Sequence, residues 1–131
     1  MQSSNAALKV FLAEDSAPIR QRVAATLAQH DMEVVGEGET PDACIDGILH
    51  SHPDVVVLDI HLEGGTGLQV LRAVRRSDPE VAFVVFSNAA EPAYRRRYLA
   101  EGATHFVDKS TEFDRLVDAV QDASNHRPPH H

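Results

Sequence analysis

The most informative segment of the chain is DVVVLDI, residues 54–60. Its interior is continuously apolar and rich in β-branched residues, and it lacks the polar alternation of a strand that has one face in water. Such a run is typical of a central parallel strand that helices cover on both faces. The segment therefore predicts the middle of an α/β sheet, with Asp59 at the carboxyl end of the central strand.

Apolar runs on either side predict four more strands, at residues 8–13, 32–38, 81–87 and 104–109. Each of the five strands is followed by a predicted helix, although the fourth helix, at about residues 90–100, has only a ragged apolar face. Strict alternation of strand and helix favours an open, doubly wound parallel sheet, because parallel strands need right-handed crossovers. The helices are expected to begin near Ser16, near Thr40, after a loop at residues 61–67, near Ala90 and near Phe113.

Length and composition restrict the class of protein. The chain has 131 residues, enough for one compact domain, and its net charge of −8 opposes direct binding of nucleic acid or anionic lipid. No apolar run approaches the ~18 residues of a membrane helix, and the single Cys44 can form no internal disulfide. We expect a cytoplasmic domain at residues 8–124, with disordered ends at 1–7 and 125–131.

Polar side chains stand at the predicted carboxyl ends of four strands. In an open α/β sheet this edge is where ligands bind. Each residue alone has an ordinary explanation, such as a helix cap or a solvated strand end. Their convergence at one edge favours a functional site made of Glu14, Asp15, Asp59, Ser87 and Lys109.

The chemistry of these residues is that of phosphoryl transfer. Three carboxylates in one crevice require a cation, and hard oxygen ligands favour Mg²⁺. Asp59, on the central strand, is a competent nucleophile for forming an aspartyl phosphate. Lys109 would screen the phosphoryl oxygens, and the Ser87 hydroxyl would donate to one of them.

Four segments carry a family resemblance: VFLAEDS (10–16), VVVLDIHLEGGTGLQVLRAVR (55–75), VVFS (84–87) and EGATHFVDK (101–109). With them the chain resembles the receiver domain of two-component response regulators over residues 8–124. The resemblance implies a flavodoxin-like (βα)5 fold with strand order 2-1-3-4-5. It also implies a phosphoprotein that receives its phosphate from a histidine kinase or histidine phosphotransfer protein in a phosphorelay.

The resemblance also implies roles for single residues. Glu14 and Asp15 match the metal-binding acids, Asp59 the phosphoacceptor, Ser87 the Ser/Thr switch and Lys109 the phosphate-sensing lysine. Such a domain catalyses its own phosphorylation and dephosphorylation and is not expected to be a turnover enzyme. One further match is the aromatic residue whose rotamer reports activation, Phe106.

Three positions depart from the family pattern or extend it. Asn88 replaces the usual Ala or Gly after Ser87, and we expect it to narrow the entry for small phosphodonors. Ser110 replaces the frequent Pro after Lys109, so a different or a strained local backbone route is expected there. His61, two residues after Asp59, is either an exposed loop residue or, when protonated, a modulator of the phosphate lifetime.

The predicted fourth helix is basic within an acidic protein. One interpretation is a solvated face whose arginines pair with Glu91 and Glu101 at i, i+4 spacing. The other is a docking surface for a downstream protein target that responds to the switch residues. Its residues would be Tyr94, Arg95, Arg96 and Tyr98.

Other functions remain open at this point. A pseudo-receiver would bind partners without phosphorylation. A haloacid-dehalogenase-like, Mg²⁺-dependent phosphatase would need a second Asp where this chain has His61, and a flavin carrier would not place Glu14 and Asp15 beside its phosphate. The sequence leaves open the kinase, the output target, the phosphate lifetime, the oligomeric state and whether the domain acts alone or within a larger regulator.

Overall fold

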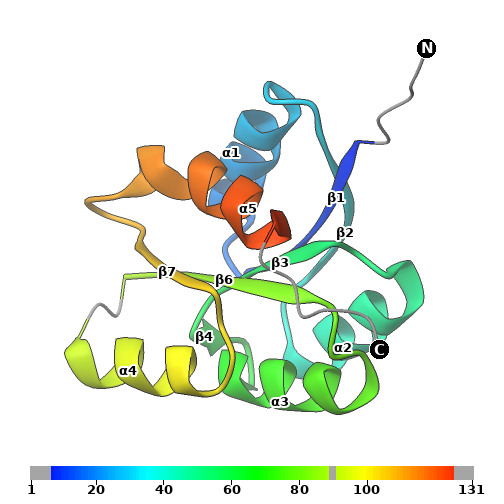
Figure 1. Ribbon diagram of the computed structural model, residues 1–131, viewed down its shortest axis with the longest axis vertical. Coiled ribbons are helices and arrows are strands. Elements are labelled where there is room, and N and C mark those ends of the chain that lie inside the picture. Colours follow the sequence, from blue (N-terminus) through cyan, green and yellow to red (C-terminus); the bar gives the residue numbers. More distant parts are fainter. Residues whose placement is uncertain (1–6, 89–90, 126–131) are drawn as a thin grey trace.

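A five-stranded parallel sheet forms the centre of the protein, in a computed structural model that describes residues 7–88 and 91–125 (Figure 1). Its strand order is β2-β1-β3-β6-β7, and every neighbouring pair is parallel. Counted along the chain within this sheet, that is the predicted order 2-1-3-4-5, which is confirmed. The strands are β1 (Leu8–Ala13), β2 (Met32–Gly38), β3 (Val55–Leu58), β6 (Ala82–Ser87) and β7 (His105–Asp108).

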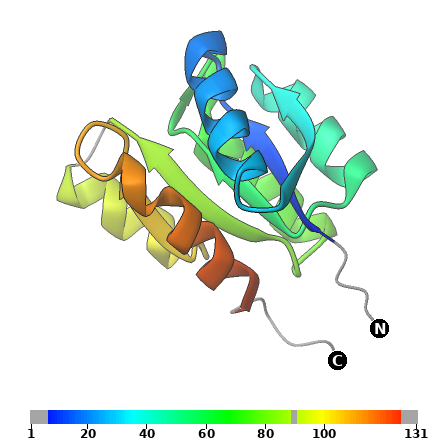
Figure 2. The same cartoon turned by 90° about the horizontal axis from the view of Figure 1, so that it is seen from above.

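Helices cover both faces of the sheet, so the doubly wound prediction is also confirmed. Helices α1 and α5 lie on one face and α2, α3 and α4 on the other (Figure 1), and in Figure 2 the first pair faces the viewer. Each layer has its own apolar core, one around Leu27 and Phe86 and the other around Phe11 and Leu71. The helices are α1 (Ala17–Ala28), α2 (Pro41–Ser51), α3 (Gly67–Ser77), α4 (Pro92–Ala100) and α5 (Leu116–Asn125), the last preceded by a 3₁₀ turn, η1 (Phe113–Arg115).

Helix starts follow local side-chain chemistry. The Ser16 hydroxyl accepts the backbone N–H of Ile19 at the start of α1, and the Thr40 hydroxyl accepts that of Ala43 at the start of α2. These are N-caps that satisfy donors left without a partner in the first turn. Both helices therefore begin where the sequence predicts, directly beyond the carboxyl ends of β1 and β2.

The segment predicted as a loop at 61–67 contains a small antiparallel pair, β4 (His61–Leu62) and β5 (Gly65–Thr66). The loop prediction is therefore wrong for these residues. The turn between the two strands includes Gly64 at φ +80°, a backbone conformation that glycine adopts without a steric penalty. The hairpin directs the chain from the end of β3 into α3.

The register of the sheet aligns the carboxyl ends of its strands. Ala13 pairs with Leu58, and the next residue on β3's side, Asp59, donates its N–H to the Ala13 carbonyl at 2.9 Å. Across the sheet, the backbone N–H of Lys109 donates to the backbone carbonyl of Ser87 at 3.1 Å. Residues that immediately follow β1, β3 and β7 consequently meet at one edge.

The predicted ends of the domain fall mostly outside the described residues. Helix α5 continues through Asn125, the first residue of the predicted tail, while residues 126–131 and 1–6 are not described. Ala90, where the fourth helix was predicted to begin, also lies outside, and α4 starts at Pro92. Within residues 7–88 and 91–125, the helices are too short or too polar to cross a membrane.

Candidate functional site

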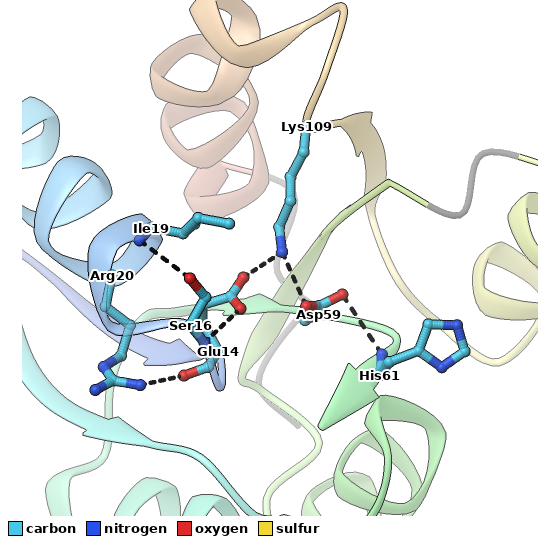
Figure 3. Close-up of polar contacts among 7 residues, drawn as sticks. All are labelled: Glu14, Ser16, Ile19, Arg20, Asp59, His61 and Lys109. Atoms are coloured by element: carbon cyan, nitrogen blue, oxygen red, sulfur yellow. Dashed lines mark hydrogen bonds and ion pairs between the residues drawn. The ribbon is translucent and has the colours of Figure 1, made fainter. Parts of the chain in front are cut away.

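Asp59 lies at the centre of the site, one residue beyond β3. Only 7% of the surface of Asp59 is exposed to solvent. Oδ2 accepts a hydrogen bond from the Lys109 ammonium at 2.9 Å, and Oδ1 accepts the backbone N–H of His61 at 3.4 Å (Figure 3). The carboxylate is thus held between Lys109 at the end of β7 and the backbone at the start of β4, at the predicted edge of the sheet.

Glu14 and Asp15 come from the end of β1 and differ in environment. Glu14 is buried; its Oε2 accepts the Ser16 N–H at 3.0 Å and its Oε1 pairs with Lys109, whereas Asp15 is exposed. Burial is the largest influence on the Glu14 carboxyl and raises its pKa, against the opposing effect of its hydrogen bonds. Each of Glu14, Asp15 and Asp59 offers one oxygen, and these oxygens lie within 4.8 Å of one another.

Lys109 joins two of these acids through one ammonium group (Figure 3). Its side chain is only 8% exposed. Burial by itself would lower the pKa of Lys109, but hydrogen bonds to Asp59 and Glu14 outweigh that effect and the pKa is raised. Lys109 stays protonated at neutral pH and balances one of the three carboxylate charges, which leaves the excess negative charge that a divalent cation would neutralise.

Ser87 and Asn88 occupy the end of β6. Ser87 is buried, as the last residue of a strand next to β3, and Asn88 is exposed. Asn88 shares with Lys109 a surface depression of about 140 Å³, whose wall includes Phe86 and Phe113. Asn88 therefore lies beside a depression that reaches Lys109 but whose wall does not include Asp59, and its predicted narrowing of the entry for small phosphodonors stays a prediction.

Phe106 and helix α4 form the neighbouring surface. Phe106 is buried in β7, and the Arg95 guanidinium lies 5.0 Å from the centre of its ring. Tyr94 makes an edge-on contact with the ring of His61, at 6.1 Å between centroids. Helix α4 therefore contacts both the aromatic residue of β7 and the residue two positions after Asp59.

One residue assigned to the exposed face of α4 does not lie there. Tyr98 is 2% exposed and belongs to the core between the sheet and helices α2, α3 and α4, on which Tyr94 also packs. Burial raises the pKa of its hydroxyl to about 12. Arg96 is exposed as predicted, and Arg97 pairs with Glu101 at 3.5 Å with the predicted i, i+4 spacing.

The backbone after Lys109 takes a local route of its own. The described residues contain no cis peptide bond. Oδ1 of Asp108 accepts the backbone N–H of Ser110 at 2.8 Å and its hydroxyl at 2.7 Å. This side-chain-supported turn, which also lowers the pKa of Asp108, corresponds to the first of the two predicted routes.

Sequence reasoning missed Arg20. Its guanidinium donates to the Glu14 carbonyl at 2.7 Å and forms ion pairs with Glu37 at 3.3 Å and Glu39 at 3.1 Å. The available signal was the pair of acids at the end of the second strand, next to the end of the first in the predicted order. The sequence does not show in which direction the Arg20 side chain leaves its helix, so these ion pairs could not be predicted from it.

Comparisons with known proteins agree with this geometry. A family model described as the response regulator receiver domain matches residues 10–121. The transcriptional regulatory protein DesR of Bacillus subtilis is 28% identical over 119 residues, which are 90% of this chain and 59% of DesR. The phosphate regulon transcriptional regulatory protein PhoB of Klebsiella pneumoniae is 30% identical over 117 residues, 88% of this chain and 51% of PhoB. The chain spans just over half the length of these curated relatives.

Solved structures show the same fold. The signal receiver domain of a NarL response regulator from Mycobacterium tuberculosis is 30% identical, with a TM-score of 0.86 over 94% of this chain and 100% of that domain. The response regulator domain of Thermotoga maritima CheB has a TM-score of 0.86 at 23% identity, over 93% of this chain and 99% of that domain. At that identity the second similarity concerns the fold alone.

Proposed function

The chain belongs to the response regulator receiver domain family, and from that membership we propose that Asp59 accepts a phosphoryl group from a phosphohistidine. The donor is a histidine kinase or a histidine phosphotransfer protein. In the transfer the P–N bond of the donor breaks, a P–O bond to an Asp59 carboxylate oxygen forms, and the histidine nitrogen keeps the electron pair. The observation that carries the proposal is the position of Asp59, bonded to Lys109 and beside two further carboxylates.

Magnesium is the cofactor proposed for this site. Glu14, Asp15 and Asp59 supply three carboxylate oxygens within 4.8 Å of one another, a donor set that suits a hard divalent ion. Only part of their charge is balanced by Lys109. When bound, the ion would screen the negative oxygens of the incoming phosphoryl group.

The roles proposed for Lys109 and Ser87 follow from charge and position. Phosphoryl transfer depends on positioning and charge neutralisation, and the Lys109 ammonium is already directed at Asp59. Once phosphate is attached, Lys109 would pair with a phosphoryl oxygen. The Ser87 hydroxyl, at the end of the neighbouring strand, would donate to another and move toward it.

The proposed output is a change at the face formed by α4, β7 and α5. Arg95 lies over Phe106, and residues of all three elements line a depression of about 350 Å³. Leu99 on its rim is 40% exposed. A downstream protein would bind this face, including Tyr94 and Arg96, when the switch residues move. We place the domain in the cytoplasm, where its phosphodonor would meet it.

A phosphorylation-independent binding module is the second candidate. The observation that favours it is the tight pairing of Lys109 with both Glu14 and Asp59, which would stabilise the site without phosphate. The phosphatase alternative gains no such support, because the residue two positions after Asp59 is the exposed His61.

The test is an amide NMR titration with Mg²⁺ and then beryllofluoride, a phosphoryl mimic. We expect shifts at Asp15, Asp59, Ser87 and Lys109 that spread into α4, and no response to beryllofluoride in Asp59→Asn. A matched control is Asp42→Asn, which removes an exposed carboxylate of α2 and should respond like the wild type. A wild type that binds neither probe would exclude the phosphoacceptor function and leave the binding-module candidate.

A further inference from the structure

We propose that Arg20 is a positioning residue for the cation site: it fixes the peptide group between Glu14 and Asp15 so that these carboxylates converge on Asp59. The proposal rests on the Mg²⁺ site proposed above and extends it to a residue outside the acidic cluster. Arg20 lies on α1, in the second turn after the Ser16 cap. It touches the site through the backbone, not through a carboxylate of the cluster.

The contacts of Arg20 span the ends of β1 and β2, and Figure 3 shows the one with Glu14. One terminal nitrogen donates to the Glu14 carbonyl at 2.7 Å, while Nε and the other terminal nitrogen pair with Glu37 and Glu39 at the end of β2. The Arg20 side chain is 13% exposed. A guanidinium spreads its N–H donors over three nitrogens in one rigid plane, so it can hold three separated acceptors in fixed directions. An ammonium has its donors on one freely rotating nitrogen and cannot hold acceptors spaced in this way.

This arrangement matters most for Asp15. The Glu14 carbonyl belongs to the peptide group that precedes Asp15, so its orientation sets the direction of the Asp15 backbone. Asp15 is exposed, and none of the described hydrogen bonds or ion pairs fixes its carboxylate. Glu14 by contrast is held by Ser16 and Lys109. The position of Asp15 therefore depends on its backbone, and the Arg20 guanidinium holds the peptide group that precedes it.

Electrostatics alone gives the opposite expectation. A positive charge next to a cation site weakens cation binding, so removing Arg20 should then strengthen it. Glu37 and Glu39 offset much of this effect, because they neutralise the guanidinium. The sign of the change in Mg²⁺ affinity therefore separates positioning from charge.

The experiment compares Mg²⁺ affinity, by amide NMR titration, in the wild type, Arg20→Met and Arg20→Lys. Loss of a residue that orients metal ligands commonly weakens metal binding by about tenfold or more. We expect at least about tenfold weaker binding in both variants, although Arg20→Lys keeps the charge. The control, Arg22→Met, removes an exposed arginine of the same helix whose ring contact is with Phe113, and it should leave the affinity unchanged.

A second readout needs no metal. In ion-free protein, hydrogen exchange at the Ser16 amide, whose N–H donates to Glu14 Oε2 across the turn, should be faster in both Arg20 variants and unchanged in Arg22→Met. Tighter or unchanged Mg²⁺ binding in folded Arg20→Lys would overturn the positioning role. If the wild type binds no Mg²⁺, the proposed cation site itself fails. Unchanged exchange at the Ser16 amide would then reject the hold of Arg20 on the turn as well.

Discussion

The ammonium of Lys109 lies 2.9 Å from Oδ2 of Asp59 and also pairs with Glu14. A single ammonium group from the end of β7 thus bridges carboxylates from the ends of β3 and β1. All three side chains are less than a tenth exposed. The stability of the ion-free domain is therefore tied to the same residues that we propose for phosphoryl transfer.

Lys109→Met should destabilise the ion-free domain. It leaves Glu14 and Asp59 close together without their shared cation, and breaking a buried pair in this way costs about 3 kcal/mol or more. Mg²⁺ should restore part of the lost free energy of unfolding, because in the proposed site it would bind the same carboxylates. Urea unfolding with EDTA and with Mg²⁺ measures both effects. The loss in free energy of unfolding should be smaller in the double variant Lys109→Met/Asp59→Asn. An equal loss there would show that repulsion between Glu14 and Asp59 is not the cause.

Gly67→Ala should displace the backbone at Asp59. A Cβ on Gly67 would lie 2.2 Å from the Asp59 carbonyl oxygen and 3.1 Å from Cγ of Leu58. Overpacking of this kind costs about 2 kcal/mol, and it should shift the Asp59 amide resonance. Urea unfolding and an amide spectrum test this prediction.

The control for that substitution is Gly64→Ala. A methyl group on Gly64 would meet no atom within 4 Å, although the φ of +80° adds a backbone cost of about 1 kcal/mol. The Asp59 amide resonance of this variant should stay in place. If Gly67→Ala left Asp59 undisturbed as well, the close approach of α3 to the end of β3 would not constrain the site.

The sequence predicted most of the fold because its strands are strongly marked. Residues 55–58 and 81–86 are continuously apolar, and the helix starts at Ser16 and Thr40 carry caps that the local sequence predicts. The acids, Ser87 and Lys109 were predictable as a group since strand ends in a parallel sheet share one edge. Their individual bonds were not, because these depend on register and side-chain direction.

The β4–β5 hairpin and the burial of Tyr98 were not predicted, and each has a physical reason. Strands β4 and β5 have two residues each, too few to show an alternation of polar and apolar residues. Tyr94 and Tyr98 are four residues apart and so lie on one side of α4, but Tyr98 is buried in the core whereas Tyr94 packs against it half-buried. The surrounding arginines hid which tyrosine was buried. Only the position of α4 over the sheet distinguishes the two.

Arg75→Lys should destabilise the opposite end of the sheet. Arg75 donates to the carbonyls of Pro79, Val81 and Gly102 at 2.7 to 3.1 Å, and an ammonium cannot reach all three. Loss of such charged hydrogen bonds should lower the free energy of unfolding by about 2 kcal/mol. Arg76→Lys, at the exposed next position, should change it by less than about 0.5 kcal/mol. Equal effects of the two substitutions in urea unfolding would contradict the assigned role of Arg75.

Cys44 should make the stability of the domain depend on alkaline pH. Its thiol is fully buried, and burial raises its pKa from 9.0 to about 12. Between pH 9 and about pH 12 the Cys44 thiol is deprotonated in the unfolded chain and protonated in the folded protein. The contribution of Cys44 to the free energy of unfolding is therefore fully present below pH 9. It is lost as the pH rises toward 12, at about 1.4 kcal/mol per pH unit.

Urea unfolding at pH 8 and pH 10 tests this sign against Cys44→Ala, which lacks the thiol but keeps other alkaline groups such as Tyr98. The wild type should lose about 1.4 kcal/mol more than the variant between the two pH values. Iodoacetamide should leave the native thiol unmodified at pH 8 and modify it in urea, since the reactive thiolate is both scarce and enclosed. Equal pH slopes with rapid native labelling would mean that Cys44 is reached by solvent in the folded domain, and that the packing of α2 on β2 opens readily.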